Sequence, residues 1–113
     1  DPLHPTEKER THIPRVKVSE TTDMLIVDGE FVDNPMPQDD YLRGFMLYVD
    51  RTVISKVMFT PENVVPHFYY EIEKKYLSAG QEITLVADCV KEDVSGIDFK
   101  YHEEVTPNVY LLK

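Results

Sequence analysis

The sequence predicts an all-β protein, an antiparallel immunoglobulin-like β-sandwich of about seven strands. Three observations predict this class. Apolar and polar residues alternate in short runs rich in Val, Ile, Tyr and Phe, as in strands with one buried face. Segments rich in Gly, Pro, Asn and Asp separate the runs, as expected for turns. No stretch has the apolar spacing of a helix of even about ten residues.

The alternating runs follow one another along the chain, and each predicts one strand. Their alternating members are Val16 and Val18; Leu25 and Val27; Phe45, Leu47 and Val49; Val53, Val57 and Phe59; Phe68, Tyr70 and Ile72; Ile83, Leu85, Ala87 and Cys89; Ile97, Phe99 and Tyr101. The segment VDRTV at residues 49–53 is short enough to join two runs in a tight hairpin. The segment YYEIEKKYL at residues 69–77 also fits helical charge spacing, but its alternation is clearer, and we predict a strand.

The length of the chain predicts a single domain. A chain of 113 residues buries about two-thirds of its unfolded surface, which is enough for a hydrophobic core without disulfides. Residues 1–11 have two prolines and mixed charges without periodicity, and we expect an extended N-terminal arm there. The β-sandwich domain then covers residues 12–113.

The charge of the chain excludes some classes of partner. It has 21 acidic and 12 basic residues, a net charge of −9, spread along its length. Such a surface repels phosphates and anionic lipids, so we expect neither nucleic-acid binding nor membrane insertion. Acidity alone identifies no positive partner; the expectation of a protein partner or a homo-oligomer comes from the interpretation of the chain as a binding or assembly module. The chain shows no signal-peptide pattern and begins at Asp1, and we expect a soluble protein, either cytoplasmic or processed and exported.

Two sets of polar residues are weak candidates for a site. His67 and His102, with Glu71 or Glu103, have metal-binding side chains, but two imidazoles at strand ends are more often surface residues. Ser55, His67 and Asp98 are the residue types of a hydrolase triad. No nucleophile-elbow sequence accompanies them, and no catalytic residue is predicted.

Two tyrosines lie outside the alternation of the predicted core. Tyr69 and Tyr76 stand beside charged residues, and exposed tyrosines are common anchors of protein interfaces. The simpler interpretation is that they cover an edge of the sandwich.

Three segments, in their order and spacing, resemble the catalytic domain of desulfoferrodoxin and superoxide reductase. THIPRVKV resembles the opening H-x-P strand of that family. NPMPQDDYLRGFMLYVD is similar to its H-P-M-x-x-x-H-Y-I loop and the following strand, and LSAGQEITLVADCVKED to its A-G segment that leads to a cysteine. The matching residues are His12 and Pro14; Pro35, Met36 and Tyr41; Ala79, Gly80, Thr84 and Cys89. The resemblance covers the chain from about residue 12 and implies a superoxide-reductase-like sandwich.

The resemblance also implies where a metal would lie. In that family a non-heme iron is held by four histidine imidazoles and one axial cysteine thiolate, with one position open to superoxide. The ligand positions correspond here to His12, Asn34, Asp40, Cys89 and Glu92. Only His12 and Cys89 have the family's residue type, so three of the five positions have changed. Thr11 stands where many members have a lysine thought to attract superoxide.

The charge of the changed ligand set argues against superoxide reduction. Fe²⁺ with four neutral imidazoles and one thiolate carries about +1, which attracts an anion. Carboxylates at Asp40 and Glu92 lower that charge to about −1, which repels superoxide and favours Fe³⁺. Asn34 adds only a weak neutral oxygen donor. An oxygen-rich set suits Ca²⁺, Mg²⁺ or Mn²⁺, but the lone thiolate suits none of these ions.

The sequence therefore predicts a degenerate iron site in a binding or assembly module without catalytic activity. Acidic neighbours Asp88, Glu92 and Asp93 disfavour a thiolate at Cys89, which we expect to be a buried, unreactive residue. No cofactor is assigned on this interpretation. The alternative is a metalloprotein or redox protein that binds iron or another divalent metal through the altered His, Asp, Cys and Glu set.

Overall fold

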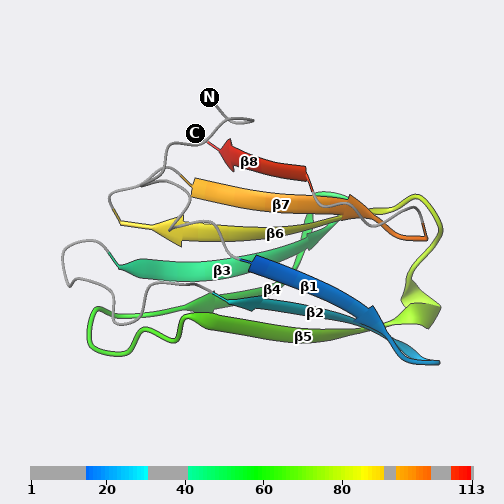
Figure 1. Ribbon diagram of the computed structural model, residues 1–113, viewed down its shortest axis with the longest axis horizontal. Helices are drawn as coiled ribbons and strands as arrows, with labels where there is room; N and C mark the ends of the chain where they lie inside the picture. The colour runs from blue at the N-terminus through cyan, green and yellow to red at the C-terminus, as the bar shows by residue number, and fades with distance from the viewer. Residues whose placement is uncertain (1–14, 31–40, 91–93, 103–107, 113) are drawn as a thin grey trace.

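The computed structural model describes residues 15–30, 41–90, 94–102 and 108–112, and these form two antiparallel sheets packed face to face (Figure 1). The three-stranded sheet has the order β1-β2-β5, with β1 Arg15–Glu20, β2 Met24–Glu30 and β5 His67–Glu73. The five-stranded sheet has the order β4-β3-β6-β7-β8, with β4 Thr52–Met58, β3 Leu42–Val49, β6 Glu82–Cys89, β7 Val94–Lys100 and β8 Asn108–Leu112. The predicted all-β sandwich is confirmed.

The core lies between the sheets and is built from the inward members of the alternating runs. Phe45 and Leu47 of β3, Leu85 of β6 and Val27 of β2 are each 0% exposed. The sheets approach closely at Gly29, where an added Cβ would lie 2.8 Å from Leu85 Cδ2. Because burial of each large aliphatic side chain stabilises the fold by about 1.5–3 kcal/mol, this interior is the main source of stability.

The predicted runs correspond to the strands β1 to β7, except that Phe59 and Tyr101 directly follow β4 and β7. The predicted burial of Val53 and Val57 in β4 is wrong, because they are 44% and 39% exposed. The strand interpretation of residues 69–77 is confirmed in its first part. β5 continues to Glu73, and a short 3₁₀ helix, η1, then covers Lys74–Tyr76. β8 is an additional strand that the alternation did not predict. The predicted arm over residues 1–11 lies outside the described residues. Within the described part of the chain, no helix has the length and apolar character needed to cross a bilayer.

The tight hairpin predicted at residues 49–53 joins β3 to β4. Its two central residues, Asp50 and Arg51, have φ of 46° and 69°, the left-handed conformation of a type I′ turn. The Asp50 carboxylate accepts hydrogen bonds from the Glu82 amide at 2.9 Å and from Gln81 Nε2 at 3.0 Å. Asp50 therefore ties the hairpin to the start of β6, whereas no such role is seen for Arg51 among the described contacts.

We predict opposite effects of glycine at the two turn positions. Arg51→Gly removes the cost of a left-handed L-residue and should stabilise the fold by up to about 1 kcal/mol. Asp50→Gly relieves the same strain but loses both carboxylate hydrogen bonds, and should destabilise by about 1 kcal/mol. Urea unfolding midpoints measure both changes, and equal shifts would contradict the assigned role of Asp50.

Candidate functional site

Cys89 is the one residue of the predicted ligand set that the structure describes. It ends β6 opposite Leu42, the first residue of β3, and is 2% exposed. The chain continues beside β3, because the Val90 amide donates to the Tyr41 carbonyl at 3.1 Å. The sulfur thus lies inside the hydrophobic core at one end of the β3–β6 ladder.

The other four predicted ligands, His12, Asn34, Asp40 and Glu92, lie outside the described residues. Their correspondence to the family's ligand positions stays a prediction. Within the described ranges, His, Cys, Asp and Glu side chains form no group of three or more that could hold a metal ion.

An ion pair lies beside Cys89 on the outer face of the sheet. Arg43 donates from Nε to Asp88 Oδ2 at 3.0 Å and from Nη2 to Asp88 Oδ1 at 3.1 Å. The hydrogen bond to Asp88, and then its negative charge, raise the pKa of Arg43, and the charge of Cys89 acts in the same direction. Asp88 is therefore a neutralised neighbour of the thiol, whereas the sequence argument counted it as a bare negative charge.

The two histidines considered as a metal pair lie apart. His67 begins β5 opposite Glu30, and its Nε2 is 2.6 Å from Asp28 Oδ1. His102 follows β7 and lines a hollow with Leu25, near the other end of β2. The residues of the hydrolase triad are also separate, because β3 and β6 lie between β4, which holds Ser55, and β7, which holds Asp98.

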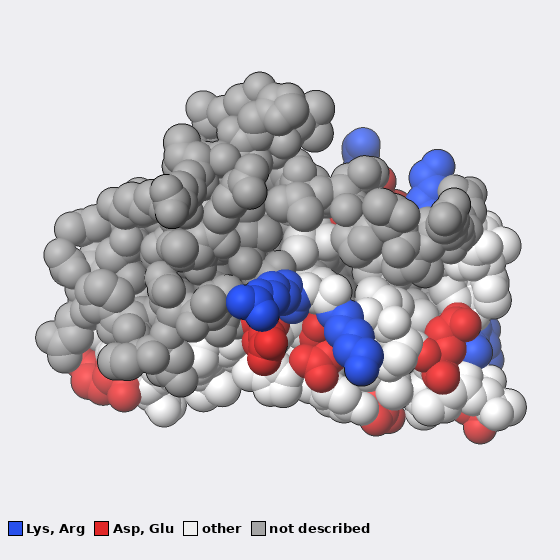
Figure 2. Space-filling view, in the orientation of Figure 1, with Lys and Arg blue, Asp and Glu red and all other residues white. Residues whose placement is uncertain are grey.

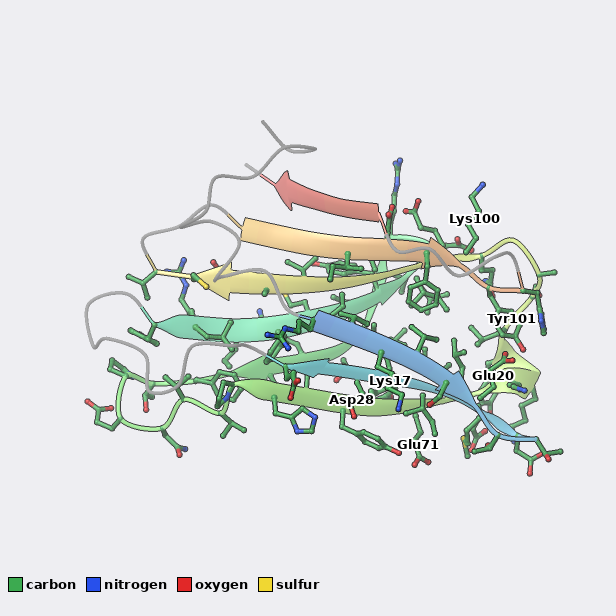
Figure 3. All side chains as sticks on the ribbon, viewed as in Figure 1. Lys17, Glu20, Asp28, Glu71, Lys100 and Tyr101 are labelled. Atoms are coloured by element: carbon green, nitrogen blue, oxygen red, sulfur yellow. The ribbon has the colours of Figure 1, made fainter. Side chains whose placement is uncertain are left out.

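The outer face of the three-stranded sheet has interspersed charges. Figure 2 shows Lys and Arg side chains next to Asp and Glu side chains along this face. The strand register accounts for the pattern, because Lys17 lies opposite Asp28 (Figure 3) and Arg15 lies opposite Glu30. The described part of this face therefore lacks the basic patch that a nucleic-acid interface needs.

Tyr69 and Tyr76 are exposed, at 51% and 71%. Tyr69 belongs to β5, an edge strand of the described three-stranded sheet, and Tyr76 to the short helix that follows it. Tyr69 lies on the outer face of β5, where its hydroxyl donates to Glu71 Oε1 at 2.8 Å and the hydrogen bond raises the pKa of Tyr69. Tyr76 stands on η1 at the mouth of a groove between β4 and β5.

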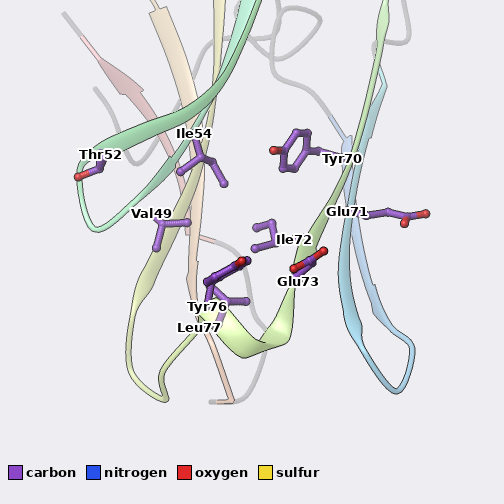
Figure 4. Close-up of a pocket in the computed structure, with 9 residues that line it drawn as sticks. All are labelled: Val49, Thr52, Ile54, Tyr70, Glu71, Ile72, Glu73, Tyr76 and Leu77. Atoms are coloured by element: carbon purple, nitrogen blue, oxygen red, sulfur yellow. The ribbon is translucent and has the colours of Figure 1, made fainter.

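The sequence did not reveal this groove. It has a volume of about 610 Å³, and its lining comes from the β3–β4 hairpin, β5 and η1 (Figure 4). The lining residues are Val49, Thr52, Ile54, Tyr70, Glu71, Ile72, Glu73, Tyr76 and Leu77. β4 also has three exposed apolar residues outside the lining, Val53, Val57 and Met58, at 44%, 39% and 50%.

Comparison with known proteins supports the fold. No family model and no curated protein sequence matches the chain. Among solved structures, the superoxide reductase from Nanoarchaeum equitans is similar, with a TM-score of 0.64 and 12% sequence identity. The match covers 80% of this chain and 93% of that chain. The chain therefore has a superoxide-reductase-like fold, as the sequence resemblance implied.

We predict that Cys89→Ala destabilises the protein by about 1 kcal/mol or slightly more, since it removes only a small buried group. Urea unfolding measures the change, and a chelator should leave the wild-type midpoint unaltered. A loss several times larger, reproduced in the wild type by the chelator, would instead identify Cys89 as an anchor for a structural metal.

Proposed function

We propose that the chain is a binding or assembly module on a superoxide-reductase-like scaffold whose iron site no longer supports superoxide reduction. One observation carries this proposal: the scaffold matches 93% of a superoxide reductase chain, while three of the five ligand-equivalent positions hold Asn34, Asp40 and Glu92. The fold and the ligand set have thus diverged to different extents.

The donor set does not fit the iron centre of that family. His12 and Cys89 are competent ligands, but two carboxylates in place of imidazoles bring a ferrous centre to about −1 and favour its oxidised form. Cys89 is 2% exposed and packs with the apolar core. In such an environment a cysteine contributes to the stability of the fold as a small apolar residue. We therefore assign no reaction step to a metal at this position.

The surface supports a binding role. Tyr69 and Tyr76 are large, exposed side chains on one strand and the short helix that follows it. Such tyrosines combine apolar contact area with a hydrogen-bonding tip, which suits protein interfaces. A protein partner or a second copy of the chain is the proposed ligand.

A metalloprotein with an altered ligand set is the second candidate, because His12 and Cys89 keep the residue types of the family's ligands. Iron or another divalent metal bound through His12, Asp40, Cys89 and Glu92 would follow.

Metal analysis separates the two candidates. We expect protein purified without oxygen, incubated with Fe²⁺ and desalted to contain far less than one iron per chain. After oxidation its visible spectrum should lack a thiolate-to-Fe³⁺ band, and Cys89→Ala should give the same result. One iron per chain, with a visible band that Cys89→Ala abolishes, would reject the first candidate and establish the second.

A further inference from the structure

The groove between β4 and β5 is open because two sheet edges flank it. In the part of the chain that the structure describes, β4 pairs only with β3, and β5 pairs only with β2. Val49 and Ile54 point into the groove from one wall, and Tyr70 and Ile72 from the other (Figure 4). Its volume of about 610 Å³ lies in the range of ligand-binding clefts, roughly 300–1,000 Å³.

The β4 edge is unsuited to pairing with another strand. Ser55 lies opposite Leu47 and Val53 opposite Tyr48, so Ile54 is an extra residue without a partner on β3. Such a bulge bends the strand and interrupts its hydrogen-bonding edge. β4 therefore forms an apolar wall of the groove.

The β5 edge is suited to pairing. All seven residues of β5 pair with β2 in one uninterrupted register, and the strand contains no proline and no lysine. A regular edge strand presents unpaired backbone groups to which an extended peptide can add. Because side chains alternate along a strand, every second residue of the added peptide would face the groove beside Tyr70 and Ile72.

The remaining residues of such a peptide would face acidic groups. Glu71 points away from the groove onto the outer face of the sheet (Figure 4), and Glu73 lies at the end of the same strand. Among the described residues that line the groove, these two are the only charged ones, and the whole chain carries −9. Lys75 lies 3.2 Å from Glu73, so Glu71 is the acidic group with no neighbouring cation among the described ion pairs.

We propose that β5 and this groove bind an extended segment of a partner protein in which apolar residues alternate with lysine or arginine. The apolar residues fill the groove, the backbone extends the three-stranded sheet, and the basic residues lie beside Glu71. This inference rests on the proposed binding function and names the chemistry of the partner.

The groove and the ligand-equivalent position lie at opposite ends of the sandwich. β3 begins at Leu42, which pairs with Cys89, and ends at Val49, which lines the groove. Peptide binding at the groove and metal binding at Cys89 can therefore be tested separately in one preparation of known iron content.

The probe is a capped peptide of seven residues, the length of β5, in which lysine alternates with valine. Titration into isotope-labelled full chain at low salt should shift the backbone amide signals of β5 and of the β3–β4 hairpin. A peptide with the same composition but its lysines grouped at one end, and one in which glutamate alternates with valine, should produce no shifts at the same concentration.

Two charge reversals of equal size test the position of the site. Glu71→Lys should weaken binding of the alternating lysine peptide at least about fivefold, because a cross-strand attraction becomes a repulsion. Glu62→Lys makes the same charge change at an exposed position outside the groove lining and should leave the affinity within about twofold. Thermal unfolding of both variants checks that the fold is intact.

Several results would overturn the proposal. These are no binding of the alternating lysine peptide, shifts that lie outside β5 and the hairpin, or equal weakening by the two charge reversals. A concentration-dependent dimer that protects the β5 amides and excludes the peptide would show that a second copy occupies the groove, and would also overturn it. Specific peptide binding supports the groove whatever the iron content, whereas stoichiometric iron contradicts only the proposed loss of the metal site.

Discussion

β3 and β6 pair along almost their whole lengths in the five-stranded sheet, and their inward side chains are the most completely buried of the described residues. Six of the seven largest fully buried side chains belong to these strands: Phe45, Leu42 and Leu47 on β3, and Ile83, Leu85 and Cys89 on β6. This ladder also sets the positions of both candidate sites. One of its ends holds Cys89 beside Leu42, and the other leads to the hairpin that walls the groove.

The same ladder shows how the fold is compatible with the proposed change of the metal site. Two of the three segments that resemble superoxide reductase contain β3 and β6, so the resemblance is carried by the strands that build the core. Asn34 and Asp40 precede β3 in the sequence, and Glu92 follows β6. Exchange at these three positions therefore changes no residue of the packed strands β3 and β6. Cys89 differs, because it is a member of the ladder and its side chain is part of the core whether or not a metal binds.

Local sequence patterns predicted the features that depend on neighbouring residues. Period-two alternation identified seven strands, preferred a strand to a helix at β5, and placed Tyr69 and Tyr76 outside the core. β8 was missed because NVYLL is a run of only five residues with apolar side chains on both parities. The Arg43–Asp88 pair and the groove join residues far apart in sequence, and the groove also needs the bulge at Ile54. These features depend on how strands distant in the sequence pair and pack, which a single sequence does not reveal.

An open sheet edge is ordinarily a hazard, because identical copies can pair through it. Here the charges around the edge limit that outcome. Glu71 and Glu73 flank the free side of β5, and a second copy brings the same net charge of −9. β1 carries the basic and apolar alternation that would match β5, but Arg15 and Lys17 already lie opposite Glu30 and Asp28 of β2. On the proposed binding mode, the acidic edge of β5 repels the same edge of a second copy and favours a basic strand from another protein.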